Sequence, residues 1–261
     1  MNEFSLYFRY LRLNFLGGLQ YQGWPLQMVG VFFTAIIDPI AVLILFSRFG
    51  AVGSWTADRV MLVYGLALTS FGFAELFSRG FDTFPWQIRT GAFDRILLRP
   101  RSTFLQVLGL RFQLNRLARV VSGLCLVGWS LVVQGVSLSF WHILQLLFAL
   151  AGGYLVYTGV FVIASAIAFW TIEAVDWIYI FTNGSYQVAK VPPEFLPPWL
   201  RRTFTFFMPM LVCSYWPAAV VCGWGVSPLL GWLPLPAGVA FLGLALAAWR
   251  LAIRQYASTG S

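Results

Sequence analysis

The sequence has few charged residues and three long runs with almost none. Charged residues make up 10% of the 261 residues and hydrophobic residues 59%, whereas a soluble domain carries roughly 25% charged residues. Residues 120–172 and 203–249 contain no Asp, Glu, Lys or Arg, and residues 13–47 contain only Asp38. Because a membrane-spanning helix needs roughly 20 mostly apolar residues, these runs exclude an ordinary soluble domain and predict an all-α integral membrane protein.

Lysine, histidine and cysteine are also scarce. Lys190 is the single lysine and does not follow the glycine-rich turn of a phosphate-binding loop, which excludes an ATPase site in this chain. His142 is the single histidine and has no acidic residue within 30 positions, so we predict no catalytic residue and a structural role for it. Cys125, Cys213 and Cys222 fit no zinc spacing, so we predict no metal site and interpret them as small buried residues.

Positive charge predominates and is concentrated in one segment. The net charge is +8, and eight of the 17 basic residues lie between Arg79 and Arg119. Lys and Arg accumulate in the cytoplasmic loops of membrane proteins, so we expect residues 79–116 to form a cytoplasmic loop. The sequence contains no basic stripe interleaved with aromatic residues, so no nucleic-acid partner is expected.

The hydrophobic runs predict six transmembrane helices in a single membrane domain, residues 1–261, with both termini in the cytoplasm. The amino terminus does not have the pattern of a cleaved signal peptide. Five of the predicted spans are residues 24–46, 60–77, 117–133, 140–170 and 235–252.

Residues 2–16 have the pattern of an amphipathic helix that precedes the first span. Arg9 and Arg12 share one face with Ser5. The opposite face carries Phe4, Phe8, Leu11 and Phe15. Such a helix lies at the membrane surface, with its arginines near anionic lipid headgroups. The alternative is that these residues begin the first span. Gly17, Gly18 and Gly23 permit a bend after it.

Two arrangements are open for residues 171–224. Four prolines in residues 192–198 cannot lie inside a helix. In one arrangement the fifth span is residues 172–190, the prolines lie outside, and residues 199–222 dip into the membrane and return. In the other, the prolines are cytoplasmic and residues 203–223 are the fifth span. The count of positive charges favours the second, because Lys190, Arg201 and Arg202 would then lie inside.

Asp38 precedes Pro39 within the first span. An ionisable residue at that depth usually faces the protein interior or water, which suggests a polar point on a transport path. The alternative is a local kink with Asp38 near the outer surface, since only nine residues separate it from Arg48.

The basic loop contains a short amphipathic helix. Gly91 permits a turn, Pro100 ends the helix, and Phe93, Ile96 and Leu97 are expected to form its apolar side. Polar positions are Arg89, Asp94, Arg95, Arg99 and Arg101. A helix of this kind in a cytoplasmic loop is typical of a docking element for another protein; the alternative is a linker held to lipid headgroups.

Residues 91–100, GAFDRILLRP, resemble the Gly-x-Phe-Asp-x-x-Leu-x-Arg-Pro loop signature in one branch of the type-2 ABC exporter permeases (ABC-2 family transporter proteins). The similarity extends to the amphipathic start, six spans, the loop between spans two and three, and the Pro-rich stretch before Phe207-Met208-Pro209. It implies that the loop couples to a cytoplasmic ATPase through Gly91, Phe93, Asp94, Leu98, Arg99 and Pro100.

The resemblance also implies that the amphipathic helix, with Phe4, Phe8, Arg9 and Arg12, touches this ATPase. It implies a re-entrant helix pair in residues 191–224, with Asp38, Phe207 and Pro209 as path or gate residues. ATP and Mg²⁺ would bind the partner ATPase, and this chain would hold no cofactor. The implied protein is the permease of an exporter in a bacterial-type inner membrane, moving an amphipathic substrate together with a second permease, identical or homologous. The alternative is a membrane scaffold or a small intramembrane enzyme.

Overall fold

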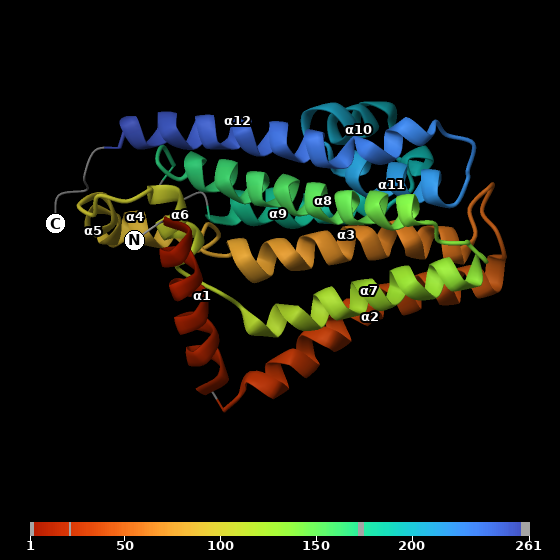
Figure 1. Ribbon diagram of the computed structural model, residues 1–261, viewed down its shortest axis with the longest axis horizontal. Helices are drawn as coiled ribbons and strands as arrows, with labels where there is room; N and C mark the ends of the chain where they lie inside the picture. Colours follow the sequence, from red (N-terminus) through yellow and green to blue (C-terminus); the bar gives the residue numbers. More distant parts are fainter. Residues whose placement is uncertain (1–2, 21, 172–174, 257–261) are drawn as a thin grey trace.

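The computed structural model describes residues 3–20, 22–171 and 175–256, apart from the side chains of residues 3, 4, 6 and 175–181. All regular elements in these residues are helices, most of them arranged in an elongated bundle (Figure 1). Five helices are long and apolar enough to cross a membrane. They are α2 (Trp24–Phe49), α3 (Ala57–Ser78), α7 (Leu117–Val133, preceded by the short η1, Leu114–Arg116), α8 (Phe140–Ile167) and α12 (Pro234–Arg254). The predicted all-α membrane fold is confirmed.

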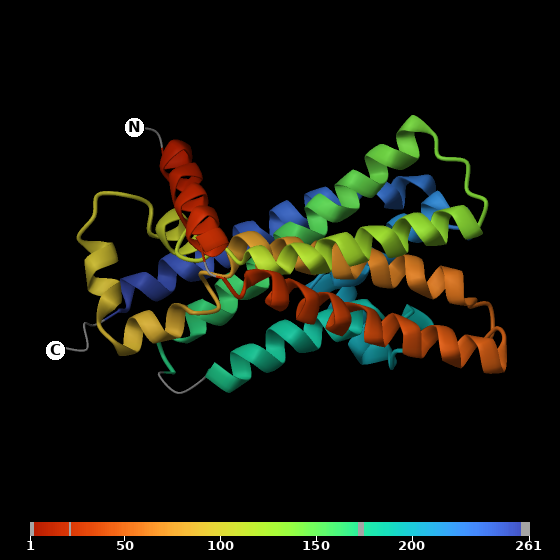
Figure 2. The ribbon, with the colours of Figure 1, turned by 90° about the horizontal axis from the view of Figure 1, so that it is seen from below.

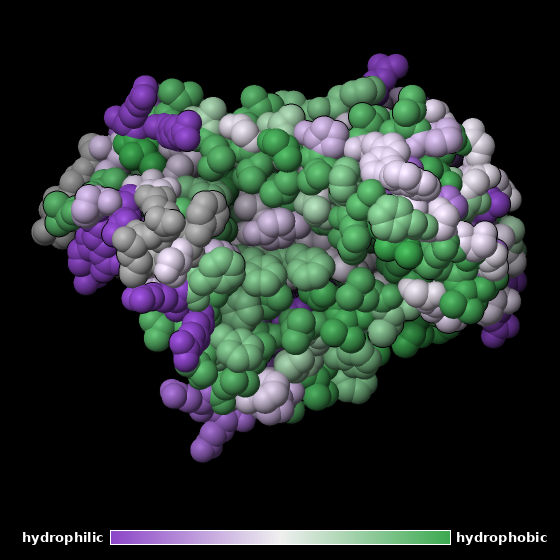
Figure 3. Space-filling view, in the orientation of Figure 1, coloured by the Kyte–Doolittle hydropathy of each residue, from purple (hydrophilic) through white to green (hydrophobic). Residues whose placement is uncertain are grey.

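Apolar side chains cover the sides of the bundle. Figure 3 shows hydrophobic residues over its middle and hydrophilic residues gathered mainly toward the ends. Helix α2 is the least covered by the rest of the protein. Only 17% of the residues in its 18-residue apolar stretch are buried, whereas 89% are buried in the corresponding stretch of α3. Hydrophobic exposure of this extent is costly in water and suits hydrocarbon.

Helix α1 (Glu3–Gln20) is separate from the first span and projects from one end of the bundle at a steep angle to its long axis (Figures 1 and 2). The chain turns at Gln22 and Gly23, while Gly17 and Gly18 remain inside the helix. The face of α1 that contacts the protein carries Tyr7, Tyr10 and Asn14. Phe8 is 66% exposed and Phe15 39%, so much of the predicted apolar face is not covered by the chain itself.

Close helix contacts around α3 and α8 depend on glycine. A Cβ on Gly65 or Gly72 of α3 would press on Val127 or Val120 of α7. Gly152 of α8 lies against the backbone at the start of α12. Small residues allow such close approach between membrane helices. The helices are therefore held in register by backbone proximity as well as by side-chain packing.

One end of the bundle carries a lobe made by the basic loop. It consists of α4 (Phe84–Arg89), α5 (Ala92–Leu97) and α6 (Thr103–Leu108), and we call this end of the molecule the lobe end. The loop between α2 and α3, which contains Trp55, lies at the opposite end, which we call the Trp55 end (Figure 1).

The structure decides between the two arrangements of residues 171–224. Helix α9 (Val175–Ala189) packs beside α3 and α8 and leads to the Trp55 end, where Glu194 accepts a hydrogen bond from Trp55 Nε1 at 3.1 Å. The next helices, α10 (Pro198–Arg202) with the π-helical η3 (Thr203–Phe207), and α11 (Met210–Val221), bend by 93° at their break.

This bent pair starts and finishes at the Trp55 end. After α11, the Trp224 ring lies 5.4 Å from that of Trp55. Between its two ends, Met210 and Cys213 reach the middle of α3 and α8 beside Ser70 and Gly153. The pair therefore enters the bundle and returns, as the family resemblance implied, and the charge count favoured the wrong arrangement. Residues 172–174, at the start of the predicted fifth span, lie outside the described residues.

One sequence interpretation is corrected by burial. Cys213 is buried and Cys222 partly buried, but Cys125 is exposed on α7. A helix that lies at the surface of a membrane bundle can carry a small apolar residue on its lipid side at no cost, so an apolar context alone does not indicate burial.

Candidate functional site

The lobe carries the residues predicted to dock another protein. Gly91 separates α4 from α5 and has φ 67°, a left-handed conformation that favours glycine. Its N–H donates to the Ile88 carbonyl at 3.1 Å, and its own carbonyl accepts from the Asp94 N–H at 3.2 Å. Gly91 thus makes the tight turn that the sequence predicted and sets the direction of α5.

Helix α5 has one buried side and one exposed side. Phe93 is fully buried and Ile96 is 6% exposed, as predicted. Leu97 was predicted to join them but is 38% exposed, and Leu98 is 84% exposed. An exposed apolar side chain in water is unfavourable, so Leu98 would gain from burial against a partner surface, as would Trp86 of α4, which is 65% exposed.

Aromatic packing fixes the buried side of α5 to the ends of distant helices. The Phe93 ring centroid lies 5.0 Å from Phe84, 5.4 Å from Phe169 and 5.2 Å from Tyr256. Trp249 of α12 lies 4.8 Å from Phe84. Phe169 follows α8 and Tyr256 follows α12, so the buried side of α5 packs against the ends of both helices. We call these five residues the aromatic cluster.

Asp94 connects α5 to the carboxyl-terminal end of α12. Tyr256 Oη donates a hydrogen bond to Asp94 Oδ1 at 3.0 Å. Burial and the neighbouring Asp94 carboxylate raise the pKa of Tyr256 to about 12. The tyrosine therefore keeps its proton, and the hydrogen bond persists, throughout the physiological pH range.

Arg99 brings the loop and α1 together. Its Nη1 donates to Tyr10 Oη at 3.4 Å, and Asn14 Nδ2 of α1 donates to the Gly109 carbonyl at 3.0 Å. Arg99 and Pro100 are exposed. The exposed residues of α1 include Phe8, Arg9 and Arg12, whereas the Phe4 side chain lies outside the described residues. The predicted docking loop and the predicted surface helix thus form one continuous surface.

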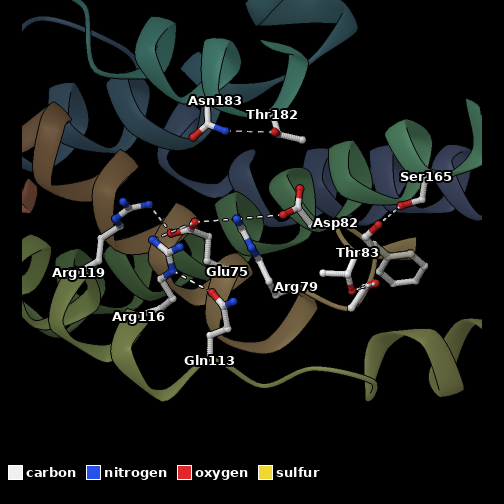
Figure 4. Close-up of polar contacts among 12 residues, drawn as sticks. Glu75, Arg79, Asp82, Thr83, Gln113, Arg116, Arg119, Ser165, Thr182 and Asn183 are labelled. Atoms are coloured by element: carbon white, nitrogen blue, oxygen red, sulfur yellow. Dashed lines mark hydrogen bonds and ion pairs between the residues drawn. The ribbon is translucent and has the colours of Figure 1, made fainter. Parts of the chain in front are cut away.

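A buried carboxylate ties the lobe end of α3 to α7 (Figure 4). Glu75 is 3% exposed; its Oε1 lies 2.8 Å from Arg79 and 3.4 Å from Arg116, and its Oε2 contacts Arg119. Arg79 also pairs with Asp82 at 2.9 Å. We call these five residues the Glu75 cluster. This cluster was not predicted from the sequence, although the spacing of Glu75 and Arg79, four residues apart in a helix, was a local signal.

The predicted path or gate residues do not form one site. Asp38 Oδ2 lies 3.0 Å from Lys190 Nζ and accepts a hydrogen bond from Tyr64 Oη at 3.3 Å. Pro39 is buried inside the continuous helix α2. Phe207 and Pro209 instead flank the break before α11, where Phe207 is 74% exposed and Pro209 is buried. The ion pair makes Asp38 a point of contact between α2 and the end of α9.

His142 has a local structural role. The His142 N–H donates to Ser139 Oγ at 3.3 Å, and its Nδ1 lies 3.5 Å from the Ser139 nitrogen, which together form a capping box at the start of α8. The structural role predicted for the histidine is therefore to cap α8.

A comparison with protein families identifies one match. The family described as ABC-2 family transporter protein covers residues 32–260, which include the lobe, the Glu75 cluster, Asp38 and the bent pair. A search of curated proteins finds no match.

Proposed function

Because the chain belongs to the ABC-2 family of transporter proteins, we propose that it is the permease subunit of an exporter driven by a separate cytoplasmic ATPase. The observation that carries this proposal is the construction of α5. Its buried side is fixed in the aromatic cluster, while Leu98 and Arg99 extend from its end into solvent. Burial of the exposed leucine against a partner is favourable, and arginine is enriched at protein interfaces, so the two residues together suit a protein-binding surface.

The distribution of basic residues supports a cytoplasmic position for the lobe. Twelve of the 17 Lys and Arg residues lie at the lobe end, and the other five are Arg48, Arg59, Lys190, Arg201 and Arg202. Positive charge accumulates on the cytoplasmic side. Both ends of the described chain, α1 and the end of α12, lie at the lobe end (Figure 1), which supports the proposal that both termini face the cytoplasm across a bacterial-type inner membrane.

Coupling follows from the contacts of α5. The partner ATPase would hold ATP and Mg²⁺ and would move the lobe when its subunits close. Phe93 does not reach the partner, because it is fully buried; it transmits motion to α8 and α12 through the aromatic cluster. Leu98 and Arg99 make the contact with the ATPase. Gly91 and Pro100 mark the two ends of the α5 segment. Asp94 positions α5 through its hydrogen bond with Tyr256.

The proposed transporter contains a second permease, identical or homologous, beside this one. A single chain leaves α2 the least buried of its candidate spans, so an apolar face of this helix is free to meet a second permease. An amphipathic cargo that enters from the inner leaflet suits spans with few polar groups.

Affinity purification in mild detergent tests the proposal. The chain is expressed with its native neighbouring genes, and co-eluting chains are identified by mass spectrometry. We expect an ATPase with a phosphate-binding loop and either one permease species or two. Elution of this chain alone in several detergents, with the neighbouring ATPase left soluble, would contradict the coupling function.

A further inference from the structure

An apolar groove lies between α2 and the segment that follows α9. Its volume is about 710 Å³, within the range of small-molecule sites, roughly 300–1,000 Å³. Helices α2 and α9 both run toward the Trp55 end of the bundle (Figure 2). The walls include Ala41, Val42 and Leu45 of α2, Val60 of α3 and Phe195. A groove of this composition suits an aliphatic chain.

The groove offers a ligand one amide, on the exposed Gln187, and one charged group, the carboxylate of Asp38. Lys190 is only 7% exposed, and its Nζ is enclosed by Asp38 and by the rings of Tyr64 and Tyr186, whose centroids lie 4.8 and 4.4 Å away. The ammonium group is therefore already stabilised by an ion pair and two cation–π contacts. An anionic ligand would have to displace these contacts to reach it.

Asp38 is placed differently. Its side chain is 53% exposed, and it lies on the same side of α2 as Ala41, Val42 and Leu45. Its Oδ2 accepts from both Lys190 and Tyr64, whereas its Oδ1 accepts no hydrogen bond from the described part of the chain. An acceptor with no donor is costly in an apolar environment. A ligand that brings a charged N–H donor would satisfy it.

We propose that this groove binds a lipophilic amine, with the aliphatic chain along α2 and the protonated amine on Asp38. The inference rests on the proposed transport function and names its substrate class. Charge complementarity selects the ligand: an ammonium group meets an open carboxylate oxygen, whereas a carboxylate or phosphate head group would be repelled by Asp38.

Ligand binding to the purified full chain tests this inference without the ATPase. The chain is placed in phosphatidylcholine nanodiscs and titrated with radiolabelled dodecylammonium, dodecanol or laurate, which share one chain length. We expect dodecylammonium to bind at least tenfold more tightly than dodecanol, and laurate no more tightly than dodecanol. No preference for the amine, or a preference for laurate, would overturn the proposal.

Two variants locate the binding site. Asp38→Asn should remove the preference for the amine, and Asp58→Asn, which removes a carboxylate at the same end of the molecule outside the groove, should retain it. Because Asp38→Asn leaves Lys190 buried without its counter-ion, the double variant Asp38→Asn/Lys190→Met serves as a second test. It should bind all three probes alike; a retained preference for the amine would show partitioning into lipid and overturn the site.

The two proposals fail in distinguishable ways. If the wild-type protein co-purifies with an ATPase but shows no preference for the amine, only the proposed substrate class is overturned. Specific amine binding without any ATPase partner would leave the groove in place and remove the transport function.

Discussion

At the scale of single residues, the Glu75 cluster places one carboxylate among three arginines. Removing that carboxylate leaves three positive side chains close together and only 15–20% exposed. We expect Glu75→Gln to lower the free energy of unfolding by about 3 kcal/mol, because a partly buried charge is left without its partner. Titration of the purified protein with SDS measures the change.

Asp82→Asn is the matched control, since Asp82 contacts one arginine of the cluster, Arg79, whereas Glu75 contacts three. Arg79 keeps its pair with Glu75 in this variant, so we expect a smaller loss of about 1 kcal/mol or less. Equal losses for the two variants would show that Glu75 contributes no more stability than a single ion pair at the edge of the cluster.

Arg99 is the residue that best separates docking from folding. Asp94 holds Tyr256, so its replacement also disturbs the aromatic cluster, whereas Arg99 is exposed and its bond to Tyr10 is long. We expect Arg99→Ala to weaken ATPase binding about tenfold, or about 1.4 kcal/mol, and to leave thermal stability unchanged. Surface plasmon resonance with the ATPase measures the affinity.

Arg89→Ala provides the comparison, because Arg89 is an equally charged, exposed residue of α4 outside the proposed contact. A similar loss of affinity in both variants would indicate a general charge effect, and no loss in Arg99→Ala would remove Arg99 from the docking surface.

Single residues were predictable from the sequence where the signal is local. The turn at Gly91 and the burial of Phe93 and Ile96 follow from spacing within ten residues. The exposure of Leu97 does not, because the buried side of α5 is defined by Phe169, Trp249 and Tyr256, which are distant in the sequence. The Asp38–Lys190 pair joins residues 152 positions apart and has no local signature.

At the scale of helices, the contact between α8 and α12 depends on Gly152. A Cβ at this position would overlap the backbone oxygen of Pro234. We expect Gly152→Ala to destabilise the protein by about 1–3 kcal/mol, because the helices must move apart to accept the methyl group. The SDS titration again reports the change.

Gly243→Ala is the control on α12, where nothing lies within 4 Å of the added Cβ. Alanine is favoured over glycine inside a helix by about 0.5–1 kcal/mol, so this variant should be neutral or more stable. If both substitutions are tolerated equally, the close approach of α8 and α12 is not a constraint.

Helix boundaries were predicted most accurately where the apolar run is unbroken. The third span was predicted at residues 117–133, the bounds of α7, because an unbroken run must hydrogen-bond its own backbone in lipid. Residues 171–224 contain no unbroken apolar run of this length. The described part of α9 has 15 residues, and prolines interrupt the chain after this helix. Three positive charges were too few to decide the side.

At the scale of the whole molecule, the bent pair brings the chain back to the Trp55 end, where Glu194 and Trp224 both contact Trp55, opposite the lobe. On the proposed function, residues 192–198 and 222–233 therefore lie on one side of the membrane and the lobe on the other. Cysteine labelling tests this in a chain whose three native cysteines are replaced by alanine. We expect an impermeant maleimide to label Pro197→Cys and Ser227→Cys in intact cells, and Arg89→Cys only after permeabilisation. Protection of Pro197→Cys together with Arg89→Cys would support the arrangement with cytoplasmic prolines.

The aromatic cluster has a consequence for synthesis of the chain. The lobe emerges before α7, α8 and α12, yet its buried side is completed by Trp249 and Tyr256, which leave the ribosome long after α5. Membrane domains are synthesised from the amino terminus, so α5 has no finished support until α12 is inserted. On the proposed function, a truncated or misinserted chain would present an unfinished surface to the ATPase, and assembly would itself select complete permeases.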